Sequence, residues 1–157
     1  MNPELTRRLA QLVRERTTAA LGTLRAGAPY VSMVPYAIAE DGSGFVIHVS
    51  TLAAHTKDML ADPRVSLLIA EPESGEKSPL GLQRVSVQGI AEQVASDAAG
   101  LPGFRSVYLT RFPDAERMFG FADFSLFLIR PVTARFVAGF GLAHSLSAET
   151  LVKILQR

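Results

Sequence analysis

The chain has 157 residues, of which 48% are hydrophobic and 20% charged, with a formal net charge of +1. This size fits one domain with a buried core, and the near-neutral charge excludes a general nucleic-acid binder. Cysteine is absent, which excludes disulfide scaffolds, thiolate catalysis and cysteine-bound metals. The charged N-terminus and the lack of a long apolar stretch predict a cytoplasmic protein with no membrane partner.

The first third of the chain predicts a helix followed by strands. Residues 3–16 place leucines on one face, Asn2 in the N-cap position and Pro3 in the first turn, which is typical of an amphipathic helix. Apolar and β-branched segments separated by glycine-containing turns then predict an antiparallel meander. These strands are expected at residues 17–24, 30–39 and 45–50.

The remaining two thirds alternates helices with further strands. A helix ends where Asp62 and Pro63 interrupt it, and the near-continuous apolar run that follows predicts a strand buried on both faces. Gly89 is a predicted β-bulge, and Pro131 is expected to separate the last two strands. The helices are expected within residues 52–61, 96–112, 114–119 and 147–156, and the strands at 65–70, 84–94, 124–130 and 133–138.

Six or so short strands with helices inserted between them do not form a βαβ series. The pattern predicts a mainly β domain, an antiparallel barrel with accessory helices. No repeat or linker divides the chain, so residues 1–157 are expected to form a single domain.

The isolated polar residues favour structural roles. His48 is interpreted as a strand side chain and His144 as a loop residue, and the histidine spacing predicts no metal site. Asp123 lies among phenylalanines and is interpreted as a cap or ion-pair partner, with an acid or base role as the alternative. No catalytic residue is predicted.

A strand-to-helix corner at residues 50–57 carries the main functional signal. A helix N-terminus offers unpaired N–H groups and positive partial charge, which suits a phosphate monoester. The alternative is a well-capped helix with a solvated lysine. The corner supplies further donors from Ser50, Thr51, His55, Thr56 and Lys57. Arg84 is interpreted as a surface charge unless the barrel brings it to this corner.

Four segments carry a family resemblance: residues 23–36, residues 55–57 with 62–67, residues 84–89 and residues 135–141. In this order they resemble the pyridoxamine 5'-phosphate oxidase-like family of FMN-binding split barrels, and their sequences are most similar to its haem-utilisation branch. The resemblance implies a six-stranded antiparallel Greek-key split barrel. It also implies a homodimer with FMN sites at the interface between its two copies.

The resemblance further implies contacts for individual residues. Ser32, Met33, Val34 and Pro35 are expected along the flavin ring, and Ser50, Thr51, His55, Thr56 and Lys57 around the ribityl chain and phosphate. Arg84 is expected to approach the flavin, and Phe140 to close the site, from the partner chain. The leading hypothesis is therefore an FMN-dependent oxidoreductase acting on a small molecule.

Two alternatives stay open. The first is a haem-binding or haem-degrading protein of the same fold, in which His144 is the late histidine available to the iron. The second is a non-catalytic interaction protein that has lost the flavin.

Overall fold

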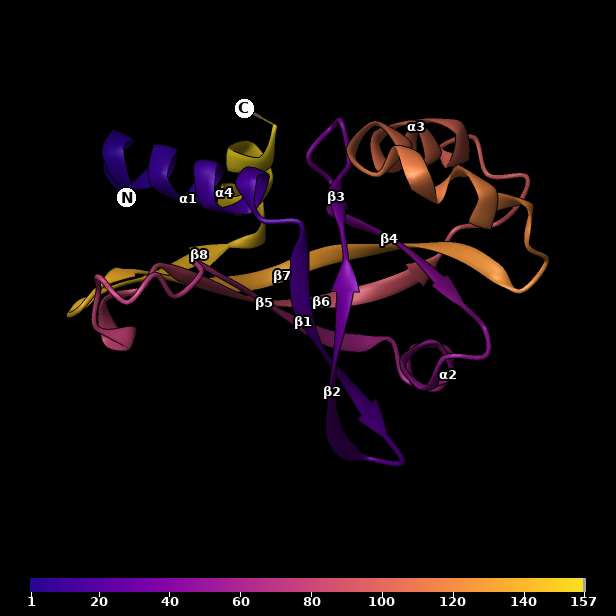
Figure 1. The fold of residues 1–157 in the computed structure, drawn as a ribbon, viewed down its shortest axis with the longest axis horizontal. Coiled ribbons are helices and arrows are strands. Elements are labelled where there is room, and N and C mark those ends of the chain that lie inside the picture. The colour runs from indigo at the N-terminus through magenta and orange to yellow at the C-terminus, as the bar shows by residue number, and fades with distance from the viewer. Residues whose placement is uncertain (157) are drawn as a thin grey trace.

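The computed structural model describes residues 1–156 and confirms a mainly β fold with accessory helices (Figure 1). One antiparallel sheet of eight strands carries four α-helices and two 3₁₀ helices, η1 and η2. The elements are α1 Pro3–Glu15, β1 Thr18–Arg25, β2 Ala28–Pro35, β3 Ala37–Ile38, β4 Phe45–Ser50, α2 Ala54–Ala61, β5 Arg64–Ala70, η1 Pro79–Gly81, β6 Arg84–Gln93, α3 Leu101–Arg111, η2 Pro113–Gly120, β7 Phe124–Gly139, β8 Leu142–Ser147 and α4 Ala148–Leu155.

The strand order shows why the sheet curls into a split barrel. The path runs β2-β1-β5-β6-β7-β4-β3, with β8 added on β7. Its two end strands, β2 and β3, are separated in sequence only by Tyr36, so the ends of the sheet must approach each other. Tyr36 is fully buried, and its hydroxyl donates a hydrogen bond to the Val13 carbonyl at 2.6 Å. This contact ties the end of α1 to the junction.

The inner face of the sheet forms the main core with α1, α2 and α4. Alternate residues of each strand point inward, as the two-residue period of a strand requires. Leu9 and Val13 of α1 and Leu151 of α4 pack in one cluster with Phe136 of β7, while Tyr108 of α3 packs in a second. The pair Val46 and Leu128 packs with α3, whereas the neighbouring pair Phe45 and Ile129 packs with α1 and α4, so α3 covers the opposite face of β4 and β7. In Figure 1, α2 lies near the β1–β2 hairpin. Within residues 1–156 no helix combines the length and apolarity needed to cross a bilayer.

Four strand predictions differ from the structure. The strand expected at residues 30–39 is divided at Tyr36 into β2 and β3, which lie at opposite ends of the sheet path. β7 runs unbroken through Pro131, because Pro131 pairs with Gly89 at the predicted bulge, where the register shifts and the missing N–H is tolerated. β8 forms where a loop around His144 was expected, since the turn at Gly139 and Gly141 folds it back on β7. β5 is buried on one face only, and Leu68 on its other face is 42% exposed.

The helix predictions agree with the structure to within a few residues. The Asn2 side chain accepts a hydrogen bond from the Leu5 N–H and caps α1, and Ser147 caps α4 in the same way through the Thr150 N–H. Both helices bury one apolar face, as their sequence periodicity predicts.

Candidate functional site

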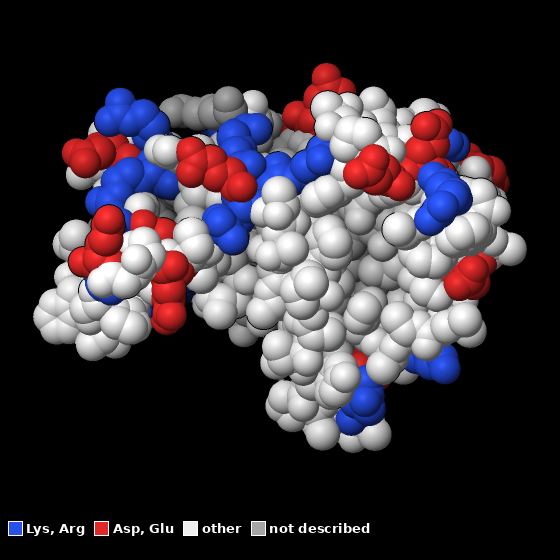
Figure 2. Space-filling view, viewed as in Figure 1, with Lys and Arg blue, Asp and Glu red and all other residues white. Residues whose placement is uncertain are grey.

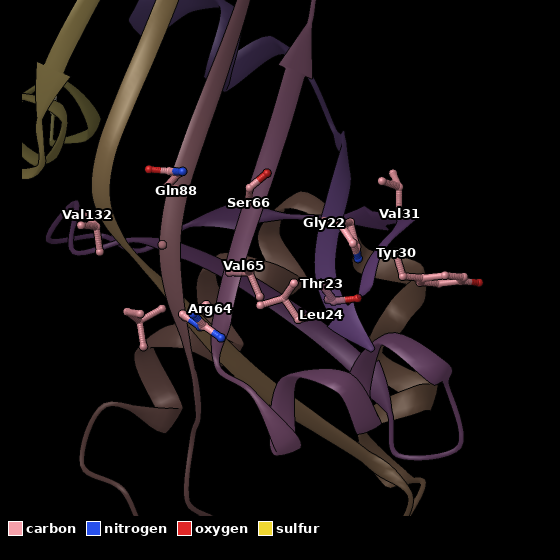
Figure 3. Close-up of a pocket in the computed structure, with 13 residues that line it drawn as sticks. Gly22, Thr23, Leu24, Tyr30, Val31, Arg64, Val65, Ser66, Gln88 and Val132 are labelled. Carbon is pink, nitrogen blue, oxygen red and sulfur yellow. The ribbon is translucent and has the colours of Figure 1, made fainter. Parts of the chain in front are cut away.

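An apolar groove of about 530 Å³ opens on the outer face of the sheet, on the side away from α1 and α4 (Figure 3). Its walls come from β1, β2, β5, β6 and β7. A volume of this order suits an organic ligand or cofactor. The lining residues are Gly22, Thr23, Leu24, Pro29, Tyr30, Val31, Arg64, Val65, Ser66, Gln88, Gly89, Ile90 and Val132.

Strand pairing explains the hollow. Gly22 is paired with Val31 on one side and with Ser66 on the other, and Ser66 is paired with Gln88. These four residues form a row across four strands, and side chains of paired residues share a face. Gly22 contributes no side chain to that row, and a Cβ there would lie 3.3 Å from the Ser66 Oγ. The glycine therefore leaves the depression into which the groove extends.

A buried carboxylate fixes one end of the groove. The Asp58 carboxylate on α2 accepts hydrogen bonds from the Thr23 Oγ1 at 2.9 Å and from the Arg25 Nε at 3.2 Å. The Arg25 side chain also lies over the Tyr30 ring, 3.7 Å from its centroid. The Arg25 guanidinium lowers the pKa of Asp58, so the carboxylate is ionised at neutral pH. This network attaches α2 to the β1–β2 hairpin.

Arg64 is the cation in the lining. Its guanidinium lies 2.6 Å from the Asp62 carboxylate, and this contact lowers the pKa of Asp62 to about 2. Both side chains are solvent-accessible, so a ligand anion can compete with Asp62 for this guanidinium.

The structure brings two of the predicted site residues into contact. The Ser32 Oγ and the His55 Nδ1 lie 3.2 Å apart, joining β2 to the first turn of α2. Burial lowers the pKa of His55, so this imidazole is neutral at pH 7. Thr56 is fully buried with its hydroxyl unpartnered among residues 1–156, whereas Lys57 is exposed.

The predicted phosphate corner is occupied by another acidic group. The Ser50 hydroxyl donates to the Asp123 carboxylate at 2.7 Å, and the Thr51 N–H donates to the Asp123 carbonyl. Within residues 1–156 Asp123 caps no helix and forms no ion pair, so it has neither of the structural roles that its position predicted. Its negative charge disfavours a phosphate at the same hydroxyl.

The other predicted residues are spread over the sheet. Met33 is exposed on the groove face of β2 and Pro35 is exposed at its end, while Val34 is buried on the opposite face. Arg84 pairs with Val137 and Phe140 follows β7, whereas Ser50 pairs with Phe124 at the other end of β7. Within one chain they do not join the residues of α2.

His144 lies on the face of the sheet that packs against α1 and α4. It pairs with Phe136, which is fully buried in the cluster containing α1, so both side chains point away from the groove. This position disfavours His144 as a ligand for anything bound in the groove. His48 is buried against Phe119 of η2. In the described residues no three acidic or histidine side chains form a cluster that would hold a metal ion.

The family model for pyridoxamine 5'-phosphate oxidase matches residues 5–138. The chain belongs to this family. Among its relatives, the chloroplast non-canonical haem oxygenase HOZ of Arabidopsis thaliana is 42% identical over 125 residues, covering 78% of this chain and 36% of the plant protein. Haem oxygenase HutZ of Vibrio cholerae is 29% identical over 141 residues, covering 88% of this chain and 79% of HutZ.

A solved family structure supports the same branch. The haem-binding protein of Mycobacterium smegmatis superposes with a TM-score of 0.86 at 28% identity, over 98% of this chain and 62% of that one. This chain therefore spans about a third of the plant relative and about three fifths of the mycobacterial protein. These relatives are haem proteins, so the predictions of FMN as cofactor, of a flavoprotein and of a flavin-dependent oxidoreductase are wrong.

Sequence reasoning did not find the groove. Gly22, Ser66 and Gln88 belong to three strands and share no motif, so only strand pairing reveals that they are neighbours. Asp58 carried a weak signal, because it follows His55 by one helical turn and therefore shares its face of α2.

Proposed function

We propose that this protein binds haem in the groove and catalyses haem oxygenation. The proposal is carried by the groove itself, an open, mainly apolar hollow in a chain of this family. Apolar walls suit the porphyrin faces, and the Arg64 guanidinium at the rim suits a propionate. The similarity to two named haem oxygenases supports the choice of haem and of oxygenase chemistry.

Haem titration of the purified protein tests the binding step. We expect a Soret band that saturates with added haem. Val31 lines the groove and is 67% exposed, so Val31→Glu places a charge against the porphyrin and is expected to weaken binding at least tenfold. Met118→Glu makes the same kind of change on η2, outside the groove, and is expected to bind like the wild type. Equal affinities for both variants would exclude the groove.

Histidine variants test whether haem binds on the groove face. His144→Ala is expected to leave the haem spectrum unchanged, because this side chain pairs with buried Phe136 on the opposite face. His55→Ala is expected to leave it unchanged too, because its partner Ser32 pairs with buried Leu21 and faces away from the groove. A Soret band lost only in His144→Ala would contradict haem binding on the groove face.

Oxygenase activity needs a separate assay. A reductant added in air to the haem complex is expected to bleach the Soret band and release iron, with catalase present so that free peroxide is not the oxidant. A stable Soret band under these conditions would refute the oxygenase step while leaving haem binding intact.

We also propose that two copies of the chain pair through the groove face. Exposed apolar side chains form a patch there that is typical of an interface rather than of a monomer surface: Val31 at 67%, Met33 at 63%, Val132 at 55% and Leu68 at 42% exposed. Phe140, 80% exposed at the β7–β8 turn, is available to reach the partner's groove.

Light scattering tests the pairing. The wild type is expected at twice the mass of one chain. Leu68→Glu puts a charge in the patch outside the groove lining and is expected to give monomers, whereas Met118→Glu should remain paired. A wild-type monomer would refute the proposal.

A further inference from the structure

A second cleft, remote from the groove, lies at the β3 edge of the sheet, where four elements meet. It measures about 630 Å³ and lies between the C-terminal ends of α1 and α4, strand β3 and helix α3. Figure 2 shows basic side chains gathered between the α1–α4 pair and the β3–α3 region. The lining residues are Arg14, Ala37, Ile38, Ala39, Glu40, Ser106, Val107, Thr110, Arg111, Leu155 and Gln156.

Two guanidiniums line this cleft from different helices. Arg14 donates one hydrogen bond to the Leu155 carbonyl at 2.6 Å, and Arg111 donates one to the Arg16 carbonyl. These bonds provide a donor for one backbone carbonyl at the C-terminal end of α4 and one at the end of α1. Each guanidinium has five N–H donors, so each arginine uses one of five in these bonds. Within residues 1–156 neither arginine forms an ion pair. Most of their hydrogen-bonding capacity therefore remains for a ligand.

Arg111 is held in an unfavourable environment for a cation without an anion. Its Nε is buried and has no hydrogen-bond partner in the described chain, while its guanidinium lies 5.2 Å from the centroid of the Tyr36 ring. Burial, together with the charge of Arg14, lowers the pKa of Arg111. A bound anion would relieve both the desolvation of this guanidinium and its repulsion from Arg14.

Helix α3 adds neutral donors beside the two cations. Ser106 and Thr110 are four residues apart, so their hydroxyls lie on the same face of the helix, and both line the cleft. A planar carboxylate pairs with one guanidinium, whereas the oxygens of a tetrahedral phosphate can accept from two guanidiniums and two hydroxyls together. Glu40 is the carboxylate of the lining and lies exposed.

We propose that this cleft binds a phosphate group, either inorganic phosphate or the phosphate of a small phosphomonoester. The apolar lining from Ile38 and Val107 would accommodate the organic part of an ester. The site is separate from the haem groove, because it lies at the β3 edge of the sheet and shares no residue with the groove lining.

Calorimetric titration at constant ionic strength tests the site with inorganic phosphate and with phenyl phosphate. Both are expected to bind. Tighter binding of phenyl phosphate would identify the ester as the preferred source, and equal binding would identify the inorganic ion. Absence of binding by both would overturn the proposal.

Two variants and one control locate the anion. Arg14→Gln is expected to weaken phosphate binding roughly tenfold or more. Thr110→Val is expected to weaken phosphate binding severalfold. The Thr110 hydroxyl, unlike Arg14, makes no hydrogen bond to the end of a helix, so this weakening does not depend on the stability of the fold. Arg117→Gln removes the same charge from η2, outside the cleft, and should leave the phosphate affinity unchanged.

The proposal fails if Arg14→Gln and Thr110→Val both bind phosphate like the wild type, or if Arg117→Gln weakens phosphate binding as much as they do. Haem affinity should be unchanged in all three variants, which separates this test from the proposed function.

Discussion

Acidification should destabilise the protein through His48, and His48→Phe should remove that sensitivity. The His48 ring is buried and stacks on Phe119 with 3.8 Å between ring centroids. Burial, aided by the charge of Arg105, lowers the pKa of His48 from 6.5 to about 4. Between these values the unfolded chain binds a proton that the folded protein does not, so stability falls as pH falls.

The size of the effect follows from the two pKa values. Each pKa unit is worth about 1.4 kcal/mol, which gives a loss of about 2 kcal/mol at pH 5 and about 3 kcal/mol at pH 4, relative to pH 7. Phenylalanine preserves the stack on Phe119 and cannot titrate. The other histidines and the carboxylates remain in both proteins, so the difference between wild type and variant isolates His48.

Urea unfolding of wild type and His48→Phe at pH 7 and pH 5 measures this difference. The wild type should lose about 2 kcal/mol more than the variant over that interval. A difference that is the same at both pH values would show that His48 titrates normally in the folded protein, and the reasoning from burial would be wrong.

Two further stability predictions concern the barrel junctions. Tyr36→Phe removes the buried hydrogen bond to the Val13 carbonyl and should cost about 1–2 kcal/mol in urea unfolding. Tyr108→Phe removes another largely buried tyrosine hydroxyl and serves as the control, which should cost less. Equal losses for the two variants would argue against the bond. Gly44→Ala should lower stability by about 2 kcal/mol or more, since the new Cβ would lie 2.2 Å from the Ile129 carbonyl oxygen. An unchanged thermal midpoint for Gly44→Ala would contradict that close approach.

The predicted phosphate corner shows what a local pattern leaves open. Residues 50–57 offer many donors, and their sequence predicts the strand-to-helix turn that the structure contains. Whether those donors face a ligand depends on residues far away in the chain. Here Asp123 takes the Ser50 hydroxyl, and the Thr56 hydroxyl is buried.

The sequence by itself determined the features that depend on near neighbours. The N-caps at Asn2 and Ser147, the amphipathic faces of the terminal helices and the bulge at Gly89 all follow from hydrogen bonds and side-chain periods within a few residues. The family segments likewise indicated the split barrel and its haem branch.

Only the tertiary structure decided the register of the strands and the sites built on it. A two-residue period tells which side chains share a face, but the same face is presented at many registers. The row through Gly22 exists because β1 pairs with β2 and β5 at one particular register. Arg14 and Arg111 line the same cleft because α1 and α3 both pack near the junction of β2 and β3. Such placements are fixed by the packing of the whole core, which no short segment encodes.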